Sequence, residues 1–263
     1  MGVLQAAVLG CIQGLTEFLP VSSSGHLILV SRIFGWPEQS VTFDAALHLA
    51  TLGAVVVALF PDLRRIGKGI FEKDPIWNRF VKKILLASVP VFAVGLFFEP
   101  WIETVFRSPV VVVANLAIWG VVLLVADRTV RSQALGDVRQ VNWKQAVGIG
   151  AAQALALVPG TSRSGVTISA GLFAGLDRET AARFSFLLGI PAIAAAGASA
   201  LLKVAEGRVS VEGFPLAVGF VCAFIFGFFS VRWLFTILRK ASYRGFAIYR
   251  LGVAAVLFLW LFL

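Results

Sequence analysis

Long runs of apolar residues fill most of the chain and are separated by short polar connections. Six of these runs approach or reach the ~20 residues that a helix needs to cross a bilayer. They are residues 41–60, 84–98 (extendable towards Trp101), 109–126, 184–202, 214–231 and 246–263. Their apolar residues are continuous rather than alternating, which is typical of membrane helices and not of barrel strands. The pattern therefore predicts an all-α polytopic membrane protein.

Two further apolar segments each contain a polar break. Residues 3–30 are interrupted by Pro20 and a serine run, and residues 146–176 are interrupted at Pro159. Proline cannot continue a helix, and serine favours the position just before a new one. Neither arm of the first segment is long enough to cross a bilayer. We therefore expect each segment to form a re-entrant helical hairpin, which enters and leaves the membrane on the same side.

The second broken segment repeats features of the first, which indicates an internal duplication. Identical residues recur 140 positions apart: Gln13 and Gln153, Ser22 and Ser162, Ser24 and Ser164, and Gly25 and Gly165. We expect one membrane domain, 1–263, built from repeats at about 1–130 and about 140–263. One hairpin and three spans per repeat make the two halves run in opposite directions. Inverted repeats with broken helices place a site near the interface of the two halves.

Composition and charge support this topology. The chain is 59% hydrophobic and 14% charged, whereas a soluble domain carries about 25% charged residues. Connections 61–83, 127–145 and 232–244 hold 15 Lys and Arg residues, against three in 99–108 and 203–213. Because basic loops stay in the cytoplasm, both termini are expected outside. No basic stripe accompanies a soluble domain, so nucleic acid is not an expected partner.

The first break concentrates reactive side chains between Gln13 and His26, where the sequence reads QGLTEFLPVSSSGH. Gln13 and Glu17 are one helical turn apart and share a face. His26 falls in the first turn of the helix that follows the break. Ionisable residues within a membrane segment are functional candidates. A helix break with capping serines is the alternative interpretation of this stretch alone.

The second break, Pro159–Thr167, reads PGTSRSGVT and places Arg163 among hydroxyl groups. The first turn of a helix presents free N–H groups and a positive dipole end, which favour an anion. A guanidinium adds paired donors that match phosphate oxygens. A buried ion pair of Arg163 with Glu17 is the alternative, but it does not explain the density of hydroxyl groups and glycines. Together the breaks offer a hydroxyl nucleophile, an acid/base pair and a phosphate-binding group.

These two motifs resemble those of the undecaprenyl-diphosphate phosphatase family linked to bacitracin resistance. The family's first motif is Glu or Gln, three residues, then Glu, and its second is PGxSRSxxT; both occur here in order. The resemblance implies hydrolysis of undecaprenyl diphosphate to undecaprenyl phosphate and inorganic phosphate, which recycles the lipid carrier for cell-wall synthesis. It also implies a multi-pass protein of the bacterial inner (plasma) membrane, with its site facing the periplasm or cell exterior. The implied partners are a polyprenyl diphosphate and the lipid bilayer.

The resemblance carries over functional residues by motif match: Gln13, Glu17, Ser23, His26, Ser162, Arg163 and Thr167. Ser23 is the candidate nucleophile, and Glu17 or His26 would take its proton. The adjacent hydroxyl groups of Ser22 and Ser24, and a phosphoenzyme on His26, stay open as alternatives. The expected phosphate-binding groups are Ser22, Ser162, Arg163, Ser164 and Thr167.

The family resemblance also implies stimulation by a divalent cation, Mg²⁺ or Ca²⁺. Glu17 and Gln13 are the candidate ligands, and Gln13 supplies one carboxylate fewer than a pair of glutamates would. A lipid-phosphate flippase or transporter, alone or in addition to a phosphatase, is the alternative function, because inverted repeats also build transporters. The sequence leaves the oligomeric state open, and a homodimer is one state that it allows.

Three other polar residues have simpler interpretations. His48 is predicted to be a helix-packing residue, and Asp44 to cap the start of its span. Arg250 is expected to reach a membrane interface or to pair internally.

Overall fold

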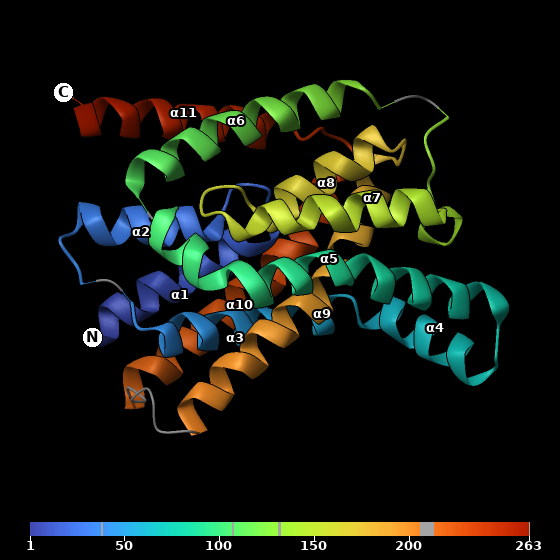
Figure 1. The fold of residues 1–263 in the computed structure, drawn as a ribbon, viewed down its shortest axis with the longest axis horizontal. Coiled ribbons are helices and arrows are strands. Elements are labelled where there is room, and N and C mark those ends of the chain that lie inside the picture. Colours follow the sequence, from blue (N-terminus) through green and yellow to red (C-terminus); the bar gives the residue numbers. More distant parts are fainter. Residues whose placement is uncertain (38, 107, 131–132, 206–212, 263) are drawn as a thin grey trace.

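The computed structural model describes residues 1–37, 39–106, 108–130, 133–205 and 213–262, and its regular structure is helical (Figure 1). The α-helices are α1 (Val3–Phe18), α2 (Ser23–Ile33), α3 (Val41–Ala58), α4 (Phe60–Phe71), α5 (Pro75–Val105), α6 (Pro109–Arg128), α7 (Trp143–Gln153), α8 (Arg163–Phe173), α9 (Arg178–Ala205), α10 (Gly213–Leu238) and α11 (Arg244–Phe262). Two short 3₁₀ helices, η1 (Val138–Gln140) and η2 (Ala154–Leu157), precede and follow α7.

Five of the described helices, α5, α6, α9, α10 and α11, are long and apolar enough to cross a membrane. A sixth candidate span is α3, which passes the same test together with α4 although the two are bent by 73°. These spans correspond to the six predicted apolar runs. An all-α, multi-pass membrane protein is therefore confirmed.

The prediction of a basic loop at 61–83 is wrong, because this segment is helical. It forms α4 and the first turns of α5. Leu63 and Ile66 of α4 pack against the core while Arg64 and Lys68 are exposed. A search for apolar runs misses such an amphipathic helix, whose apolar residues form only one stripe. The predicted connection 99–108 is likewise mostly helix, since α5 continues to Val105, and most of the predicted loop 203–213 lies outside the described residues.

Both polar breaks separate two helices, as predicted, and the same local geometry occurs at each. Ser22 and Ser162 are the N-caps of α2 and α8, with φ of 77° and 76°. Their hydroxyl oxygens accept hydrogen bonds from the backbone N–H of Gly25 (3.4 Å) and Gly165 (3.1 Å). A positive φ is uncommon for a residue with a side chain and often occurs at functional sites. The two breaks differ in one respect, because the 3₁₀ helix η2 lies directly before the second break only.

The two broken segments approach each other from opposite ends of the molecule. Figure 1 shows α1 and α2 extending from the end that carries both termini, whereas α7 and α8 extend from the end where α4 lies. Glycines allow each hairpin to approach a long helix closely: a Cβ at Gly10 of α1 would overlap the carbonyl oxygen of Gly219 in α10. A Cβ at Gly150 of α7 would overlap the carbonyl oxygen of Ala87 in α5. The breaks therefore meet inside the helical bundle.

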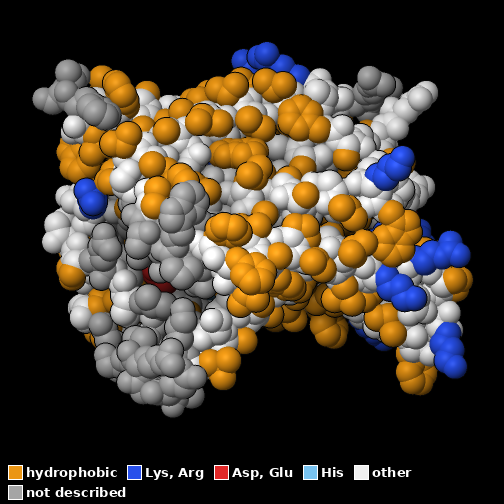
Figure 2. Space-filling view, viewed as in Figure 1, with side chains coloured by type: hydrophobic (Ala, Val, Ile, Leu, Met, Phe, Trp, Pro, Cys, Tyr) orange, Lys and Arg blue, Asp and Glu red, His pale blue; other side chains and the backbone are white. Residues whose placement is uncertain are grey.

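The three predicted basic connections lie together at one end. The Lys83 ammonium donates a hydrogen bond to the carbonyl of Val141, and the backbone N–H of Tyr243 donates to Asp127 Oδ1 (3.2 Å). Figure 2 shows several Lys and Arg side chains over the end of the molecule that carries α4. The chain termini lie at the opposite end (Figure 1). The basic connections and the chain termini therefore lie at opposite ends of the helical bundle.

Ion pairs connect helices at this basic end. The Arg183 guanidinium of α9 pairs with Asp62 of α4. Arg139 donates two hydrogen bonds to Asp137 Oδ2 (2.6 and 2.8 Å) and lies over the Trp77 ring, 5.8 Å from its centroid. The hydrogen bond from Arg139 lowers the pKa of the Asp137 carboxyl below its usual value. These contacts fix the connections between spans against one another.

Candidate active site

Glu17 is the centre of the polar site. It lies in the last turn of α1 and is 7% exposed. Its Oε2 accepts hydrogen bonds from Ser23 Oγ (2.7 Å) and from Gln13 Nε2 (3.1 Å), one helical turn earlier. Its Oε1 accepts a hydrogen bond from Arg163 Nη2 (3.1 Å). One buried carboxylate thus joins a hydroxyl, an amide and a guanidinium from both breaks.

Arg163 is held on several sides at the start of α8. Its Nη1 donates to the carbonyl of Ser185 in α9 (3.2 Å), and its guanidinium lies 5.9 Å from the Phe18 ring centroid. A Cβ at Gly189 would overlap the guanidinium, so Arg163 lies close to α9 at this glycine. The buried Arg163 Nε has no hydrogen-bond partner among the described residues. One donor of this fixed cation is therefore available for a further acceptor.

The other hydroxyl groups of the second break connect elements of the structure. Ser164 Oγ donates to the carbonyl of Leu19 in the first break (3.0 Å) and lies 3.2 Å from Ser162 Oγ. Thr167 Oγ1 lies 2.6 Å from Ser185 Oγ and is fully buried. Three of the predicted phosphate-binding hydroxyl groups thus lie beside Arg163, where they tie α8 to the first break and to α9.

His26 and Ser23 face different partners. Sequence spacing predicts that a turn brings them together, but Ser23 bonds to Glu17 while His26 faces α11. His26 Nδ1 lies 2.7 Å from the carbonyl oxygen of Ser22, and Nε2 lies 2.8 Å from the Tyr249 hydroxyl. Of the two predicted bases, Glu17 is the one within hydrogen-bonding distance of the Ser23 hydroxyl.

The interpretation of His48 as a packing residue misses its position beside Glu17. His48 Nε2 lies 3.7 Å from Glu17 Oε2, and Nδ1 lies 2.8 Å from the carbonyl oxygen of Asp44. A signal was present, because an ionisable residue within a membrane span is a functional candidate. The predicted cap at Asp44 is wrong: the cap of α3 is Ser40, whose Oγ accepts from the N–H of Phe43 (3.2 Å).

Arg250 of α11 pairs internally, which is one of its two predicted roles, rather than reaching a membrane interface. It is fully buried, and its guanidinium donates to five backbone carbonyl oxygens. These belong to Gly160 (2.9 Å), Thr161 (3.1 Å), Pro20 (3.2 Å), Asn115 (3.2 Å) and Leu116 (3.2 Å). The carbonyl groups come from both breaks and from α6, so one side chain joins the three. An arginine within an apolar run of the sequence marks Arg250 as a functional candidate. The sequence does not reveal its partners, because they lie far away along the chain.

The oxygen atoms of Glu17 and Gln13 suit a cation that takes only some of its ligands from the protein. Gln13 Oε1 is buried without a hydrogen-bond partner among the described residues, and Nε2 of the same amide bonds to the Glu17 carboxylate. The described residues contain no group of three or more His, Cys, Asp and Glu side chains placed to hold a metal. Mg²⁺ is commonly held by one or two carboxylates with phosphate oxygens and water. One carboxylate and one amide oxygen fit this mode of binding.

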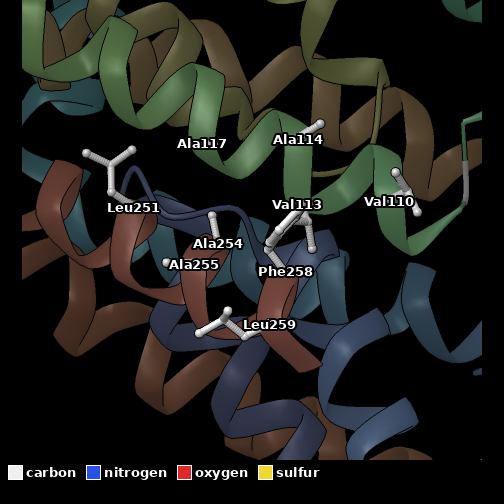
Figure 3. A pocket seen from close by; sticks show the side chains of 9 residues that line it. All are labelled: Val110, Val113, Ala114, Ala117, Leu251, Ala254, Ala255, Phe258 and Leu259. Atoms are coloured by element: carbon white, nitrogen blue, oxygen red, sulfur yellow. The ribbon is translucent and has the colours of Figure 1, made fainter. Parts of the chain in front are cut away.

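A separate apolar groove of about 550 Å³ lies between α6 and α11. Figure 3 shows Val113 and Ala117 of α6 facing Leu251 and Phe258 of α11 across it. Its lining residues are all apolar, and none is a predicted site residue. The lining of this groove therefore suits hydrocarbon rather than a charged group.

Comparisons with known proteins agree with the motifs. A family model described as "Bacitracin resistance protein BacA" matches residues 6–256. An undecaprenyl-diphosphatase of Rubrobacter xylanophilus is 45% identical over 267 residues, which cover 97% of this chain and 96% of that protein. An undecaprenyl-diphosphatase of Moorella thermoacetica is 43% identical over 258 residues, covering 98% of this chain and 97% of that protein. The protein of the same name from Chloroherpeton thalassium is 41% identical, covering 95% of this chain and 94% of its own.

Proposed function

The chain belongs to the bacitracin resistance protein BacA family, and on that premise we propose that it hydrolyses undecaprenyl diphosphate to undecaprenyl phosphate and inorganic phosphate. The observation that carries this proposal is the shared carboxylate: Glu17 accepts hydrogen bonds from both Ser23 and Arg163. A nucleophile, its base and a phosphate-binding cation thus lie together in a membrane protein. The product would return to cell-wall synthesis as the lipid carrier.

The geometry supports Ser23 as the nucleophile. Glu17 takes the proton of the Ser23 hydroxyl, 2.7 Å away, as Oγ attacks the terminal phosphorus. The bond from that phosphorus to the bridging oxygen breaks, and undecaprenyl phosphate leaves with the oxygen. The departing undecaprenyl phosphate takes the proton from Glu17, which becomes a base again. Water then cleaves the Oγ–phosphorus bond: its hydroxyl stays on the phosphate, and Glu17 takes its other proton and returns it to Ser23 Oγ. A phosphoenzyme on His26 is the second candidate, and it is less favoured because His26 Nε2 faces Tyr249.

Arg163 stabilises the negative charge of the transferring phosphoryl group. Phosphoryl transfer depends mainly on positioning and on charge stabilisation. The guanidinium is fixed by Ser185 and Glu17, and its Nε is left for a substrate oxygen. A donor that is already fixed needs no reorganisation during the reaction, which makes it effective.

Glu17 and Gln13 Oε1 would hold a divalent cation, Mg²⁺ or Ca²⁺, next to the bound diphosphate. When bound, the ion would neutralise part of the diphosphate charge. The support for this assignment is the unpartnered Gln13 oxygen beside the one carboxylate.

Two inverted repeats, at about 1–130 and about 140–263, are part of the proposal. They are supported by the matching conformations of Ser22 and Ser162 and by hairpins that extend from opposite ends (Figure 1). Each hairpin also packs against a long helix of the other repeat, α1 on α10 and α7 on α5. Because each hairpin packs on a helix of the other repeat, both repeats are needed to form the site.

We also propose that the protein lies in the bacterial inner membrane with its site open to the periplasm or cell exterior. The clustered basic connections support a cytoplasmic location for the α4 end. That end is tied together by Arg183 with Asp62 and by Arg178 Nε with Asp127 Oδ1 (2.6 Å). At the break, Ser24 and Tyr249 are exposed.

The direct test is release of inorganic phosphate from undecaprenyl diphosphate by the purified protein in detergent, with Mg²⁺ or Ca²⁺. No transmembrane gradient exists there, so phosphate release requires an enzyme. We expect turnover that depends on the cation. If neither cation supports turnover, while vesicles containing the protein move the labelled lipid between leaflets, the phosphatase proposal fails and transport is supported.

A further inference from the structure

The Tyr249 hydroxyl is the partner of the outer nitrogen of His26. The two rings are nearly parallel, with an interplanar angle of 8° and centroids 5.7 Å apart. The Tyr249 oxygen lies 2.8 Å from His26 Nε2. The tyrosine comes from the last helix, α11, and the histidine from the second helix, α2. Neither sequence motif includes Tyr249.

The hydrogen bonds of His26 determine which ring nitrogen carries the proton. Nδ1 lies 2.7 Å from the carbonyl oxygen of Ser22, which can only accept, so Nδ1 must be the N–H donor. In a neutral imidazole Nε2 is then the acceptor, and the Tyr249 hydroxyl donates to it. Arg250, the residue that follows Tyr249, donates its hydrogen bonds to five carbonyl oxygens.

The register of α11 fixes Tyr249 in this position. Arg250, the next residue, is bound to the carbonyl oxygens of Pro20 and Gly160 in the two breaks. Any shift of α11 that moved Tyr249 from His26 would therefore also break these bonds. Tyr249 is 47% exposed, so this residue lies at the surface of the helical bundle rather than in its core.

We propose that Tyr249 is a positioning residue of the phosphatase, which holds the His26 ring in one orientation and in the tautomer that carries its proton on Nδ1. This inference rests on the proposed function, in which His26 is a functional residue carried over from the family motif. Tyr249 acts through His26 and itself forms no bond to phosphorus.

The main experiment combines Tyr249→Phe with a double-mutant cycle. Loss of one hydrogen bond is expected to lower kcat roughly 3- to 10-fold, with KM within about twofold of wild type. His26→Ala is expected to cost more, and Tyr249→Phe added to His26→Ala is expected to cost nothing further. Tyr243→Phe is the matched control, since the chain has two tyrosines and Tyr243 bonds to the carbonyl of Arg178 at the other end.

The tautomer of His26 gives a readout that does not depend on turnover. The chain contains only two histidines, so ¹⁵N-labelled histidine gives signals from His26 and His48 alone, and His48→Ala assigns them. We expect a protonated Nδ1 and an unprotonated Nε2 at His26 in neutral wild type. In Tyr249→Phe the population with a protonated Nε2 should rise, whereas Tyr243→Phe should leave the spectrum unchanged.

Each outcome decides a different point. Wild type without phosphate release overturns the proposed function and this inference with it. Active wild type together with a fully active Tyr249→Phe overturns this inference alone. The inference is also overturned if the kcat losses of Tyr249→Phe and His26→Ala multiply in the double variant. An unchanged His26 spectrum in Tyr249→Phe overturns it as well.

Discussion

Arg163 Nη2 lies 3.1 Å from Glu17 Oε1, although the two residues are 146 positions apart in the chain. The pair joins the two breaks, and Glu17 also accepts a hydrogen bond from the Ser23 hydroxyl. An ion pair alone would satisfy the two charges, which is the alternative considered from the sequence. The adjacent hydroxyl and the unpartnered Nε of Arg163 are what the ion pair alone leaves unexplained.

Replacing Arg163 separates catalysis from stability. Arg163→Ala is expected to lower kcat by roughly 10²–10³, the effect of removing one fixed donor from a transition state. Arg163→Lys should recover only part of the activity, because an ammonium cannot replace the planar donor pair. Steady-state turnover and detergent Tm are measured for both variants. If Arg163→Ala simply fails to fold while Arg163→Lys is fully active, the role is that of an ion pair.

Ser23→Ala should abolish phosphate release more completely than Arg163→Ala, because no covalent route remains. Ser23→Cys is expected to keep slight activity. Ser24→Ala is the matched control. Ser24 is the next residue in the chain and is exposed, so phosphate release by this variant should stay near that of wild type. Rapid acid quenching with radiolabelled substrate should trap phosphoserine in wild type only. An active Ser23→Ala variant would move the nucleophile to His26 or to water.

Removal of the Arg250 guanidinium should destabilise the fold. Arg250→Met leaves five buried carbonyl oxygens without this donor, and we expect the detergent Tm to fall by about 10 °C. The Tm of Arg250→Lys should lie between those of wild type and Arg250→Met, because an ammonium keeps three hydrogen-bond donors. Arg244→Met, at an exposed position of the same helix, is the control. A Tm equal to that of wild type for Arg250→Met would mean that water or other donors satisfy these carbonyl groups.

The predicted sidedness can be checked with single cysteines. With Cys11 and Cys222 changed to Ser, cysteines at Gly67 and Gly136 are expected to react with impermeant thiol reagents only in inverted vesicles or broken cells. Gly67 lies in open space on α4, so a side chain fits there. Labelling of either position in intact spheroplasts would place the basic end outside and reverse the topology.

Cation binding should be weak without substrate. One carboxylate and the Gln13 oxygen supply few ligands, so Mg²⁺ needs the diphosphate oxygens to complete its shell. Calorimetry should show tight binding only when a prenyl diphosphate analogue is present. Gln13→Glu adds a carboxylate and is expected to strengthen binding in the absence of lipid. Tight stoichiometric binding to wild type alone would contradict this assignment.

The sequence predicts features that depend on neighbours along the chain. Pro20 ends α1 and Ser22 caps α2 whatever else surrounds them, and the apolar runs locate the spans. Contacts between distant segments are a different matter. The position of His48 beside Glu17, and of Tyr249 beside His26, depends on how helices pack, and apolar runs do not encode packing.

The amphipathic helix α4 shows the same limit at the level of secondary structure. Its bases dominate the composition of 61–83, so the segment resembles a solvated loop. The stripe formed by Leu63 and Ile66 becomes informative only when a helical period is tested.

The position of Arg250 has a consequence for biosynthesis. The guanidinium that joins both breaks belongs to α11, which follows both breaks in the chain and therefore leaves the ribosome after them. While the chain is still being synthesised, the carbonyl groups of Pro20 and Gly160 have no such donor. This side chain can therefore join the two breaks only after α11 has entered the membrane, and we expect a chain truncated before α11 to be inserted but inactive.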